Sequence, residues 1–410
     1  MNWKNKQVLI TGINGFVGSY LANELIDKKC KVYGLMRDQS KITSENLTNK
    51  NIDQKINPLI GDLRDISTIS NALEESQPDY IFHLAAQSFV PISFKKPKLT
   101  YDVNVMGTLN LLEAMRTSEC DGRMIFAGSG DEYGLVISSK DQYNEILKKY
   151  NSIFPDISDE FESELAINEN NPLRPMNPYA TSKVSGEFLT RNYHNAYDLD
   201  CVVARCFNHE GAGRGEDFVT SVITSQVVDV LNNKCDSINI GNVNALRDWS
   251  HISDMINSYM TLALNAQSGQ VYNQGSMRTN SILSYILLSI QEAGFNINSI
   301  ETFNHDKKIT NPTEINEDKY YGVSFKKTKV DSMFLDNMLE YTIKDKGILV
   351  KTDNKDIKVV FNPERFRPSD VPILLSDTGK IEKIGFDRKY ELNNIINDQI
   401  NYYKKRQLNQ

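Results

Sequence analysis

The chain has 410 residues, 40% of them hydrophobic and 24% charged, which is the composition of a globular protein of one large or two packed domains. Its net charge of -7 argues against a general attraction to nucleic acid or an anionic membrane. The five cysteines contain no CxxC pair, against a zinc site, and no apolar run approaches the ~18 residues of a membrane span. We therefore expect a cytoplasmic protein without a metal, nucleic-acid or membrane partner.

A glycine-rich segment near the N-terminus predicts a dinucleotide-binding loop. The apolar run Gln7–Thr11 is rich in β-branched residues, as in a strand, and a helical pattern follows. In a GxxGxxG loop the first glycine permits a turn, the second lets the backbone approach a pyrophosphate, and the third allows close packing of a helix whose N–H groups face the anion. A plain turn is the alternative. The candidate cofactor contacts are Gly12, Asn14, Gly15, Phe16, Val17 and Gly18.

The end of the next predicted strand bears on the choice between NADP and NAD. Lys31–Met36 ends at Arg37, where a dinucleotide fold places the group that contacts the adenine ribose. An acidic residue there would favour NAD, whereas an arginine can pair with a 2′-phosphate. We expect NADP, with NAD as the alternative, because Asp38 follows directly and Arg37 could be a solvated strand end.

Two further segments predict more strands of the same sheet. The sequence GDLRD at 61–65 follows an apolar run, and residues 80–86 (YIFHLAA) have the composition of a buried parallel strand. Alternation of strands and helices is typical of a doubly wound parallel α/β sheet of the Rossmann type. The further cofactor contacts expected in these segments are Asp62, Leu63, Leu84, Ala85 and Ala86.

A tyrosine and a lysine form the leading catalytic pair. Tyr179 and Lys183 lie one turn apart on one face of a predicted helix. A phenol with a pKa near ~10 is a weak base at neutral pH, and a neighbouring ammonium lowers that pKa. Tyr179 is thus the candidate acid/base for a substrate hydroxyl, and Lys183 could also hold the nicotinamide ribose. Ser129 follows an apolar run, at the carboxyl end of a strand, and could hydrogen-bond the same oxygen; a turn serine and a chance YxxxK match are the alternatives.

Taken together, these motifs resemble a known family. TGxxGxxG, GDLRD, HLAAQS and YxxxK are similar to the extended short-chain dehydrogenase/reductases that act on nucleotide sugars. The second half resembles GDP-mannose 4,6-dehydratases in NHE…RG..FVT (208–220), GN…RDW.H (241–251) and FRP.(D/E)V (366–371). The resemblance implies a Ser129–Tyr179–Lys183 triad, a cofactor contact at His209, and a substrate site at Ser88, Asn208, Arg214, Val219, Asn242, Arg247 and Arg367. The three arginines are permanently charged forks suited to a diphosphate, although surface salt bridges are the alternative for each.

Several positions depart from the dehydratase pattern. The dehydratases usually have TSExYG where this chain has Ser129-Gly130-Asp131-Glu132-Tyr133-Gly134, so Asp131 takes the place of their catalytic glutamate. We expect Asp131, one methylene shorter, to be the carboxylate that removes the C5 proton, with Glu132 in reserve. Ser221 and Val222 replace the usual Arg-Lys, and the Arg-Ser-Ser loop linked to tetramers is not evident.

The chain is expected to form two parts. Residues 1–200 would be the dinucleotide-binding domain, with a polar, helical insertion at about 137–170 and a return of the chain at about 236–260. Residues 201–410 would mainly bind the nucleotide sugar, with an insertion at about 303–359 in which 348–360 predicts two strands around an Asp-Asn turn. The first insertion could cover the active site; surface decoration or an oligomer contact is the alternative for both.

The resemblance implies an NADP-dependent 4,6-dehydratase that converts a GDP-hexose, GDP-mannose or a close relative, to the 4-keto-6-deoxy sugar. A 4-keto-sugar reductase or an epimerase on the same fold is the first alternative, and a non-catalytic nucleotide-binding scaffold is the remote one. A homodimer or a higher homo-oligomer is expected.

Overall fold

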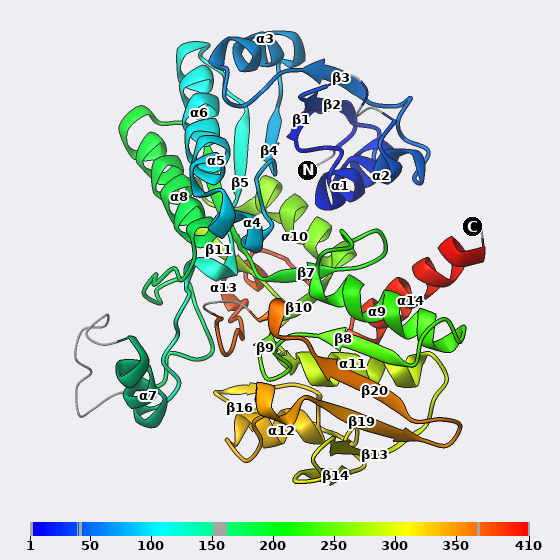
Figure 1. The fold of residues 1–410 in the computed structure, drawn as a ribbon. Coiled ribbons are helices and arrows are strands. Elements are labelled where there is room, and N and C mark those ends of the chain that lie inside the picture. Colours follow the sequence, from blue (N-terminus) through cyan, green and yellow to red (C-terminus); the bar gives the residue numbers. More distant parts are fainter. Residues whose placement is uncertain (1–2, 39, 41–42, 151–161, 367–369, 409–410) are drawn as a thin grey trace.

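The structure is a computed structural model that describes residues 3–38, 40, 43–150, 162–366 and 370–408. In this part of the chain a parallel sheet with helices on both faces stands beside a smaller lobe built on a second sheet (Figure 1). The predicted doubly wound α/β class is confirmed.

The larger sheet has seven parallel strands in the order β11-β6-β5-β4-β1-β2-β3. The order reverses at β1, so the chain winds outward in both directions and leaves a crevice at the carboxyl ends of β1 and β4. The strands are β1 (Gln7–Thr11), β2 (Lys31–Met36), β3 (Asn57–Ile60), β4 (Tyr80–His83), β5 (Arg123–Ala127), β6 (Cys201–Cys206) and β11 (Val271–Gln274).

Alternate residues of each strand serve opposite faces of the sheet. Val8 and Ile10 pack in the core formed with α1 and α10, whereas Leu9 packs in the core formed with α3, α6 and α8. Because both faces are covered, the strands are apolar throughout. The helices of this part are α1 (Phe16–Asp27), α2 (Glu45–Thr48), α3 (Ile66–Ser76), α4 (Val90–Lys95), α5 (Pro97–Tyr101), a π-helical turn (Asp102–Met106), α6 (Gly107–Thr117), α8 (Pro178–Tyr197), α10 (Ile252–Asn265) and α13 (Gly379–Glu382).

The smaller lobe has a five-stranded sheet in the order β14-β13-β19-β20-β8. The two strands predicted within 348–360 are confirmed as the antiparallel pair β19 and β20. The elements are β8 (Ser237–Ile240), β13 (Ile297–Thr302), β14 (Lys308–Thr310), β19 (Gly347–Thr352), β20 (Ile357–Phe361), α9 (Val219–Leu231), α11 (Ile282–Glu292), α12 (Lys329–Leu335) and α14 (Leu392–Leu408), with the strand pairs β7–β10 (Asn208–Glu210, Trp249–His251), β9–β12 (Leu246–Arg247, Asn280–Ser281), β15–β18 (Ile315–Asn316, Lys327–Thr328) and β16–β17 (Lys319–Tyr320, Val323–Ser324).

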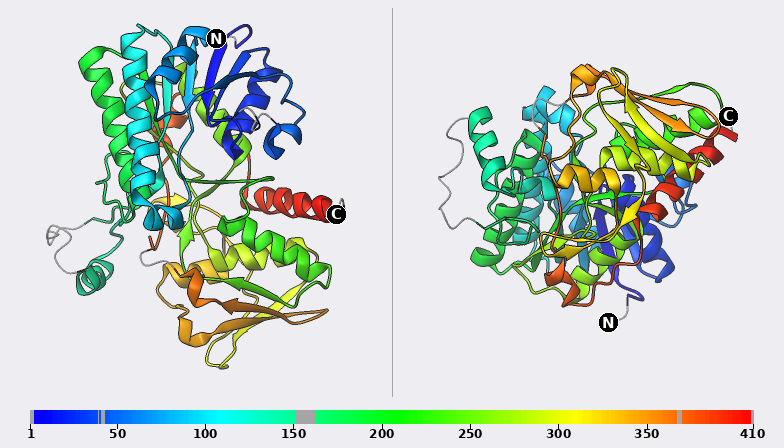
Figure 2. Two further views of the ribbon diagram at one scale, coloured as in Figure 1. Left: turned by 45° about the horizontal axis from the view of Figure 1, so that its top comes forward. Right: turned by 90° about the horizontal axis from the view of Figure 1, so that it is seen from below.

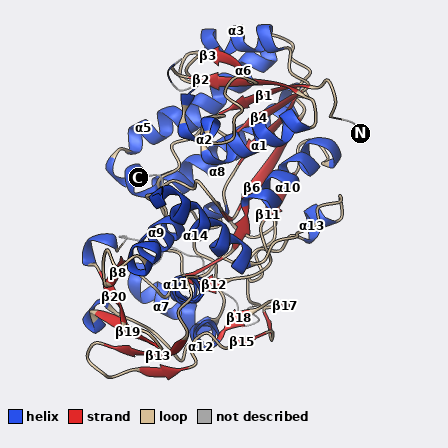
Figure 3. Ribbon diagram, turned by 90° about the vertical axis from the view of Figure 1, so that its right-hand side faces the viewer, coloured by secondary structure: helices blue, strands red, loops and turns tan. Residues whose placement is uncertain are grey.

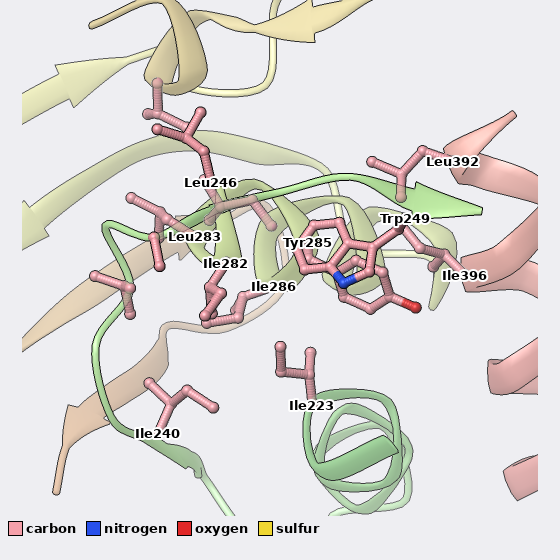
Figure 4. Close-up of a cluster of buried hydrophobic side chains, with 14 of the residues drawn as sticks. Ile223, Ile240, Leu246, Trp249, Ile282, Leu283, Tyr285, Ile286, Leu392 and Ile396 are labelled. Carbon is pink, nitrogen blue, oxygen red and sulfur yellow. The ribbon is translucent and has the colours of Figure 1, made fainter. Parts of the chain in front are cut away.

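The core of the smaller lobe is large and apolar. Trp249 and Tyr285 meet edge to face with ring centroids 4.8 Å apart, and Ile223 of α9 and Ile396 of α14 lie beside them (Figure 4). Helix α14 packs against α9 and α11, so the C-terminal segment closes this lobe (Figures 1 and 3). Burial of this continuous cluster supports the loops that face the larger sheet.

The two sheets do not follow the chain in two simple blocks. Strands β6 and β11 come after residue 200 and complete the larger sheet, whereas β8, within the predicted return of the chain, joins the smaller one. The division predicted at residue 200 stays a prediction. Segments from both halves of the chain therefore meet at the carboxyl edge of the larger sheet.

The insertion after the active-site motif begins with a helix. Helix α7 (Lys140–Tyr150) projects from the body of the molecule (Figures 1 and 2), and residues 151–161 lie outside the described part. At the base of the insertion, the Glu164 carboxylate accepts a hydrogen bond from the Ile137 N–H at 2.8 Å. It also accepts one from each terminal nitrogen of Arg174, at 2.7 Å. These bonds hold the two ends of the insertion together.

Candidate active site

The loop between β1 and α1 has a geometry that requires glycine. Gly12 has a φ of +75°, and a Cβ on it would lie 2.9 Å from backbone atoms of Ala85. A Cβ on Gly18 would lie 2.3 Å from the Gly12 carbonyl oxygen, so α1 packs directly on the turn. The helix begins at Phe16, after the N-cap Gly15. This is the turn, close packing and helix N-terminus expected of a phosphate-binding loop.

The other residues predicted to contact the cofactor gather around this loop. Arg37 is exposed directly after β2, and Asp62 follows β3. Hydrogen bonds from Arg64, and the charge of Arg37, hold the pKa of Asp62 below its usual value. The loop after β4 is tied to β1, because the Ala85 N–H donates to Thr11 Oγ1 at 3.1 Å. Leu63 is buried, and Asn14, Val17, Leu84, Ala85 and Ala86 are partly buried.

His209 closes the same space from β7. Its ring lies parallel to that of Phe16, with centroids 6.5 Å apart, and its Nδ1 is 3.1 Å from the Phe207 carbonyl oxygen. Burial lowers the pKa of His209 to about 3, so the ring is neutral at physiological pH. A neutral ring beside the glycine loop is suited to contact with the cofactor.

Ser129, Tyr179 and Lys183 come together at the carboxyl end of β5. Ser129 precedes a single 3-10 turn (Gly130–Glu132) and accepts a hydrogen bond from the Asp131 N–H at 3.2 Å. Tyr179 is in the first turn of α8, where the Asn177 side chain caps the helix by accepting the Ala180 N–H. Lys183 Nζ lies 6.0 Å from the centroid of the Tyr179 ring. The predicted triad therefore shares one site.

One electrostatic expectation at this triad is wrong. The pKa of Tyr179 is raised, not lowered, because its hydroxyl is buried and the Asp131 carboxylate lies near it, which outweighs a hydrogen bond with Ser129. Lys183 does not offset this, since its Nζ donates to the Ala127 carbonyl oxygen at 2.6 Å. Burial lowers the pKa of Lys183 itself to about 8.

The two adjacent carboxylates occupy different environments. Asp131 is partly exposed on the Tyr179 side, where its charge contributes to the raised pKa of the phenol. Glu132 has no exposed surface, and its Oε1 accepts the Ser129 N–H at 2.6 Å. Asp131 is thus the carboxylate that a ligand near Tyr179 can reach.

Arg214 and Asn208, two of the predicted substrate contacts, come from the second half of the chain. The Arg214 guanidinium lies 3.5 Å from the centroid of the Phe218 ring. Arg214 Nε lies 3.5 Å from Glu210 Oε2 in a buried ion pair. Within the described residues, neither Arg214 Nε nor Asn208 Oδ1, both buried, has a hydrogen-bond partner. Val219 begins α9, whose N-cap Phe218 provides no side-chain cap. Unsatisfied polar atoms beside a helix N-terminus suit an anionic, hydrogen-bonding ligand.

A second polar group lies where the C-terminal segment returns. Arg247 directs three N–H groups to the carbonyl oxygens of Leu246 and Val371 and to Asp370 Oδ1, at 2.9, 2.6 and 2.6 Å. Asn242 Nδ2 donates to the other oxygen of Asp370 at 3.2 Å. Arg247 thus orients a carboxylate here instead of presenting an unoccupied fork. Ser88 is exposed in the loop after β4, and Arg367 lies outside the described residues.

Sequence reasoning missed a buried ionic network beneath the triad. Arg205 of β6 donates to both oxygens of Glu187, from Nε and Nη2, at 2.7 Å each, and Nη1 donates to the Tyr133 hydroxyl at 2.9 Å. Glu187 lies one turn after Lys183 on α8, but its partner Arg205 is 18 residues away in the chain, so the sequence held no local signal for the network.

Among the described residues, no cluster of three or more potential metal ligands and no helix able to span a membrane is found.

Comparisons with known proteins place the chain among nucleotide-sugar enzymes. The sequence profile described as "NAD dependent epimerase/dehydratase family" matches residues 8–275. The GDP-mannose 4,6-dehydratase of Yersinia enterocolitica is 31% identical over 93% of this chain and 89% of its own length. The GDP-mannose 4,6 dehydratase 1 of Arabidopsis thaliana is 32% identical over 76% of this chain and 80% of its own length.

Solved structures share the fold at lower identity. The UDP-glucose 4-epimerase of Thermotoga maritima, solved with UDP-glucose, has a TM-score of 0.68 at 20% identity and covers 98% of this chain and 99% of its own. The protein RMD of Pseudomonas aeruginosa, complexed with NADPH, has a TM-score of 0.66 at 20% identity over 98% of this chain and 99% of its own. These likenesses establish the fold alone.

Proposed function

Since the chain belongs to the NAD dependent epimerase/dehydratase family, we propose that this nucleotide-sugar 4,6-dehydratase acts on a GDP-hexose, GDP-mannose or a close relative, with NADP as its cofactor. The product is the GDP-4-keto-6-deoxy sugar. The observation that supports this most is the meeting of Ser129, Asp131, Tyr179 and Lys183 at the end of β5, beside a glycine loop.

The residues around the glycine loop fit a nicotinamide dinucleotide. The close approach of Gly12 to Ala85 leaves no room for a side chain, and the α1 N-terminus faces the same loop. Arg37 would pair with the 2′-phosphate of NADP, and for this reason we propose NADP over NAD. When bound, the nicotinamide supplies a reversible hydride acceptor, so no external reductant is needed for a net loss of water.

Tyr179 and Asp131 each carry out a different proton transfer in the proposed reaction. Tyr179 takes the proton of the C4 hydroxyl as the hydride leaves C4, with Ser129 hydrogen-bonded to the same oxygen. The resulting ketone acidifies the C5–H bond, and Asp131 removes that proton. The C6 hydroxyl would leave as water with the proton held by Asp131. The bound cofactor would supply the hydride that C6 regains, while C5 takes the proton held by Tyr179. Lys183 would hold the nicotinamide ribose, and its ammonium would favour the tyrosinate if Nζ left the Ala127 carbonyl oxygen.

The nucleotide is held from the second half of the chain. Arg214 and the N–H groups at Val219 would bind the diphosphate, and Asn208 Oδ1 would receive a hydrogen bond from the ligand. Asp370, oriented by Arg247 and Asn242, would accept hydrogen bonds from ribose or base. Ser88 and Arg367 complete the predicted set of contacts.

A single assay tests the assignment. Purified protein is incubated with a panel of nucleotide sugars that includes GDP-mannose, and mass spectrometry follows loss of one water without added reductant. We expect the loss with GDP-mannose or a close relative. Consumption of NADPH with a 4-keto sugar, and no loss of water from any nucleotide sugar, would instead indicate a reductase. Bound NADP without any turnover would indicate a scaffold.

A further inference from the structure

Glu132 is a buried carboxyl group that the proposed mechanism does not use. Its Oε1 accepts the Ser129 N–H at 2.6 Å. A Cβ on Gly128 would lie 2.7 Å from the same oxygen, so the glycine makes room for the carboxyl group. The side chain is therefore fitted into the end of β5, beneath the residue that faces the substrate.

The charges around Glu132 do not balance if it is ionised. The Arg205 fork is used by Glu187, and Glu132 Oε2 lies 3.9 Å from Arg205 Nε, beyond hydrogen-bonding distance. No described residue donates a hydrogen bond to that oxygen. Arg191 adds a second, partly exposed guanidinium, but its Nη1 donates to Glu187 Oε1 at 3.3 Å. An ionised Glu132 would therefore lie buried without a hydrogen-bonded cation of its own, which is costly in a medium of low dielectric.

The other titratable groups near Glu132 do not change this balance. Lys183 Nζ is bonded to the Ala127 carbonyl oxygen, and burial raises the pKa of both the Cys206 thiol and the Tyr133 phenol. Burial, followed by the Glu187 charge and a hydrogen bond with Glu187, raises the pKa of Glu132 well above its usual value. Two carboxyl groups share a hydrogen bond only when one of them holds a proton, so a proton on Oε2 would account for the lack of a donor to that oxygen.

On the basis of the function proposed above, we propose that Glu132 is a neutral carboxylic acid that positions Ser129 against helix α8. It accepts the Ser129 N–H through Oε1 and donates its own proton to Glu187, one turn beyond Lys183. Strand β5 and helix α8 are thereby joined directly beneath the catalytic residues. Glu132 is a positioning residue, and its proton does not enter the reaction.

Two substitutions separate positioning from proton transfer. Glu132→Gln keeps one acceptor and one donor without a titratable proton, and should retain kcat within about threefold and the pH profile of the wild type. Glu132→Leu removes both bonds, and should lower kcat by about 10²-fold with little change in the Kd for NADP, because small displacements of reacting groups are costly. The proposal would be overturned if Glu132→Gln lost as much kcat as Asp131→Asn does. A normal kcat in Glu132→Leu would also overturn it.

A spectroscopic test does not depend on turnover or on the folding of the leucine variant. The infrared difference between wild type and Glu132→Gln at neutral pH should contain the C=O stretch of a protonated carboxyl group. Bands of an ionised carboxylate in its place would overturn the neutral state. If the protonated band is present but no nucleotide sugar loses water, the proposed function fails while the charge state of Glu132 stands.

Discussion

At the scale of single residues, the proposed reaction depends most on Asp131. It is one methylene shorter than the glutamate usual in the resembling dehydratases, yet it lies on the Tyr179 side of the 3-10 turn. We expect Asp131→Asn to lower kcat by about 10² to 10⁴-fold, with a small change in KM, because a general base is lost while binding groups remain. Steady-state kinetics and exchange of the C5 proton with deuterated water measure this.

The matched control restores the carboxylate with a longer reach. Asp131→Glu should keep C5 exchange and at least a tenth of the wild-type kcat, since the carboxylate is retained at a position that is only partly buried. Near-normal exchange in Asp131→Asn would show that another group removes the proton.

The sequence reveals residues whose partners are near in the chain and misses those whose partners are distant. Tyr179 and Lys183 are recognisable from a spacing of four, and Ser129 from its place after an apolar run. Glu187 and Arg205 are 18 residues apart and Arg205 meets Tyr133 across 72, so no local pattern predicts the network. The raised pKa of Tyr179 comes from the burial of its hydroxyl and from the nearby Asp131 carboxylate, which the spacing of Tyr179 and Lys183 does not reveal.

At the scale of elements, His83 joins three of them. It ends β4, its Nδ1 lies 2.8 Å from Thr11 Oγ1 of β1, and its Nε2 lies 3.0 Å from Thr108 Oγ1 of α6. The Thr108 hydroxyl donates to the Asn104 carbonyl oxygen, so it accepts from Nε2–H, and Thr11 donates to Nδ1. The neutral ring satisfies every partner, and a second proton would displace Thr11.

This arrangement predicts acid sensitivity. Burial, with the Lys183 charge second, lowers the pKa of His83 to about 3, while the unfolded chain binds the proton near ~6.5. Stability should therefore be complete above pH ~6.5 and fall as the pH decreases toward 3, by up to about 1.4 kcal/mol per pH unit for this group. Urea unfolding at several pH values gives the slope of the unfolding free energy against pH. In His83→Gln this slope should be smaller than in the wild type, by the equivalent of up to one bound proton. An unchanged slope in His83→Gln would contradict the assignment.

The same element shows how far strand prediction reaches. The apolar run 80–86 predicts a strand of seven residues, but β4 ends at His83 and the next three residues form a loop over Gly12. Composition identifies a run of apolar side chains, whereas the neighbouring strands determine where the hydrogen-bonded pairing of β4 ends. The pair β19–β20 was predictable because its turn is local.

At the scale of the whole molecule, one buried carboxylate unites the returning segments. Asp248 accepts hydrogen bonds from the N–H and hydroxyl groups of Ser276 and Ser376 at 2.5 to 3.0 Å. It thereby joins the segment after β9, the end of β11 and the C-terminal segment near Asp370. The proposed substrate groups of the second half are thus held on the larger sheet by a satisfied polar hub.

A face of apolar side chains bears on assembly. The packed helices α5 and α8 and the π-helical turn between α5 and α6 expose Leu99, Tyr101, Met106 and Phe188, the last two at 46% and 54%. Exposed apolar side chains on packed elements can mark a contact with a second chain, and a two-fold contact would cover them. We propose a homodimer through this face, and expect sedimentation to give twice the chain mass for wild type and the chain mass for Met106→Asp/Phe188→Asp. Met338→Asp, at a site 66% exposed in the smaller lobe, should remain dimeric.

A monomeric wild type, or a dimer that persists in the double variant while circular dichroism shows an intact fold, would rule this face out. Since Lys183 and Glu187 lie on the buried side of α8, a dimer would support from outside the helix that carries the proposed catalytic residues. The melting temperature should then rise with protein concentration.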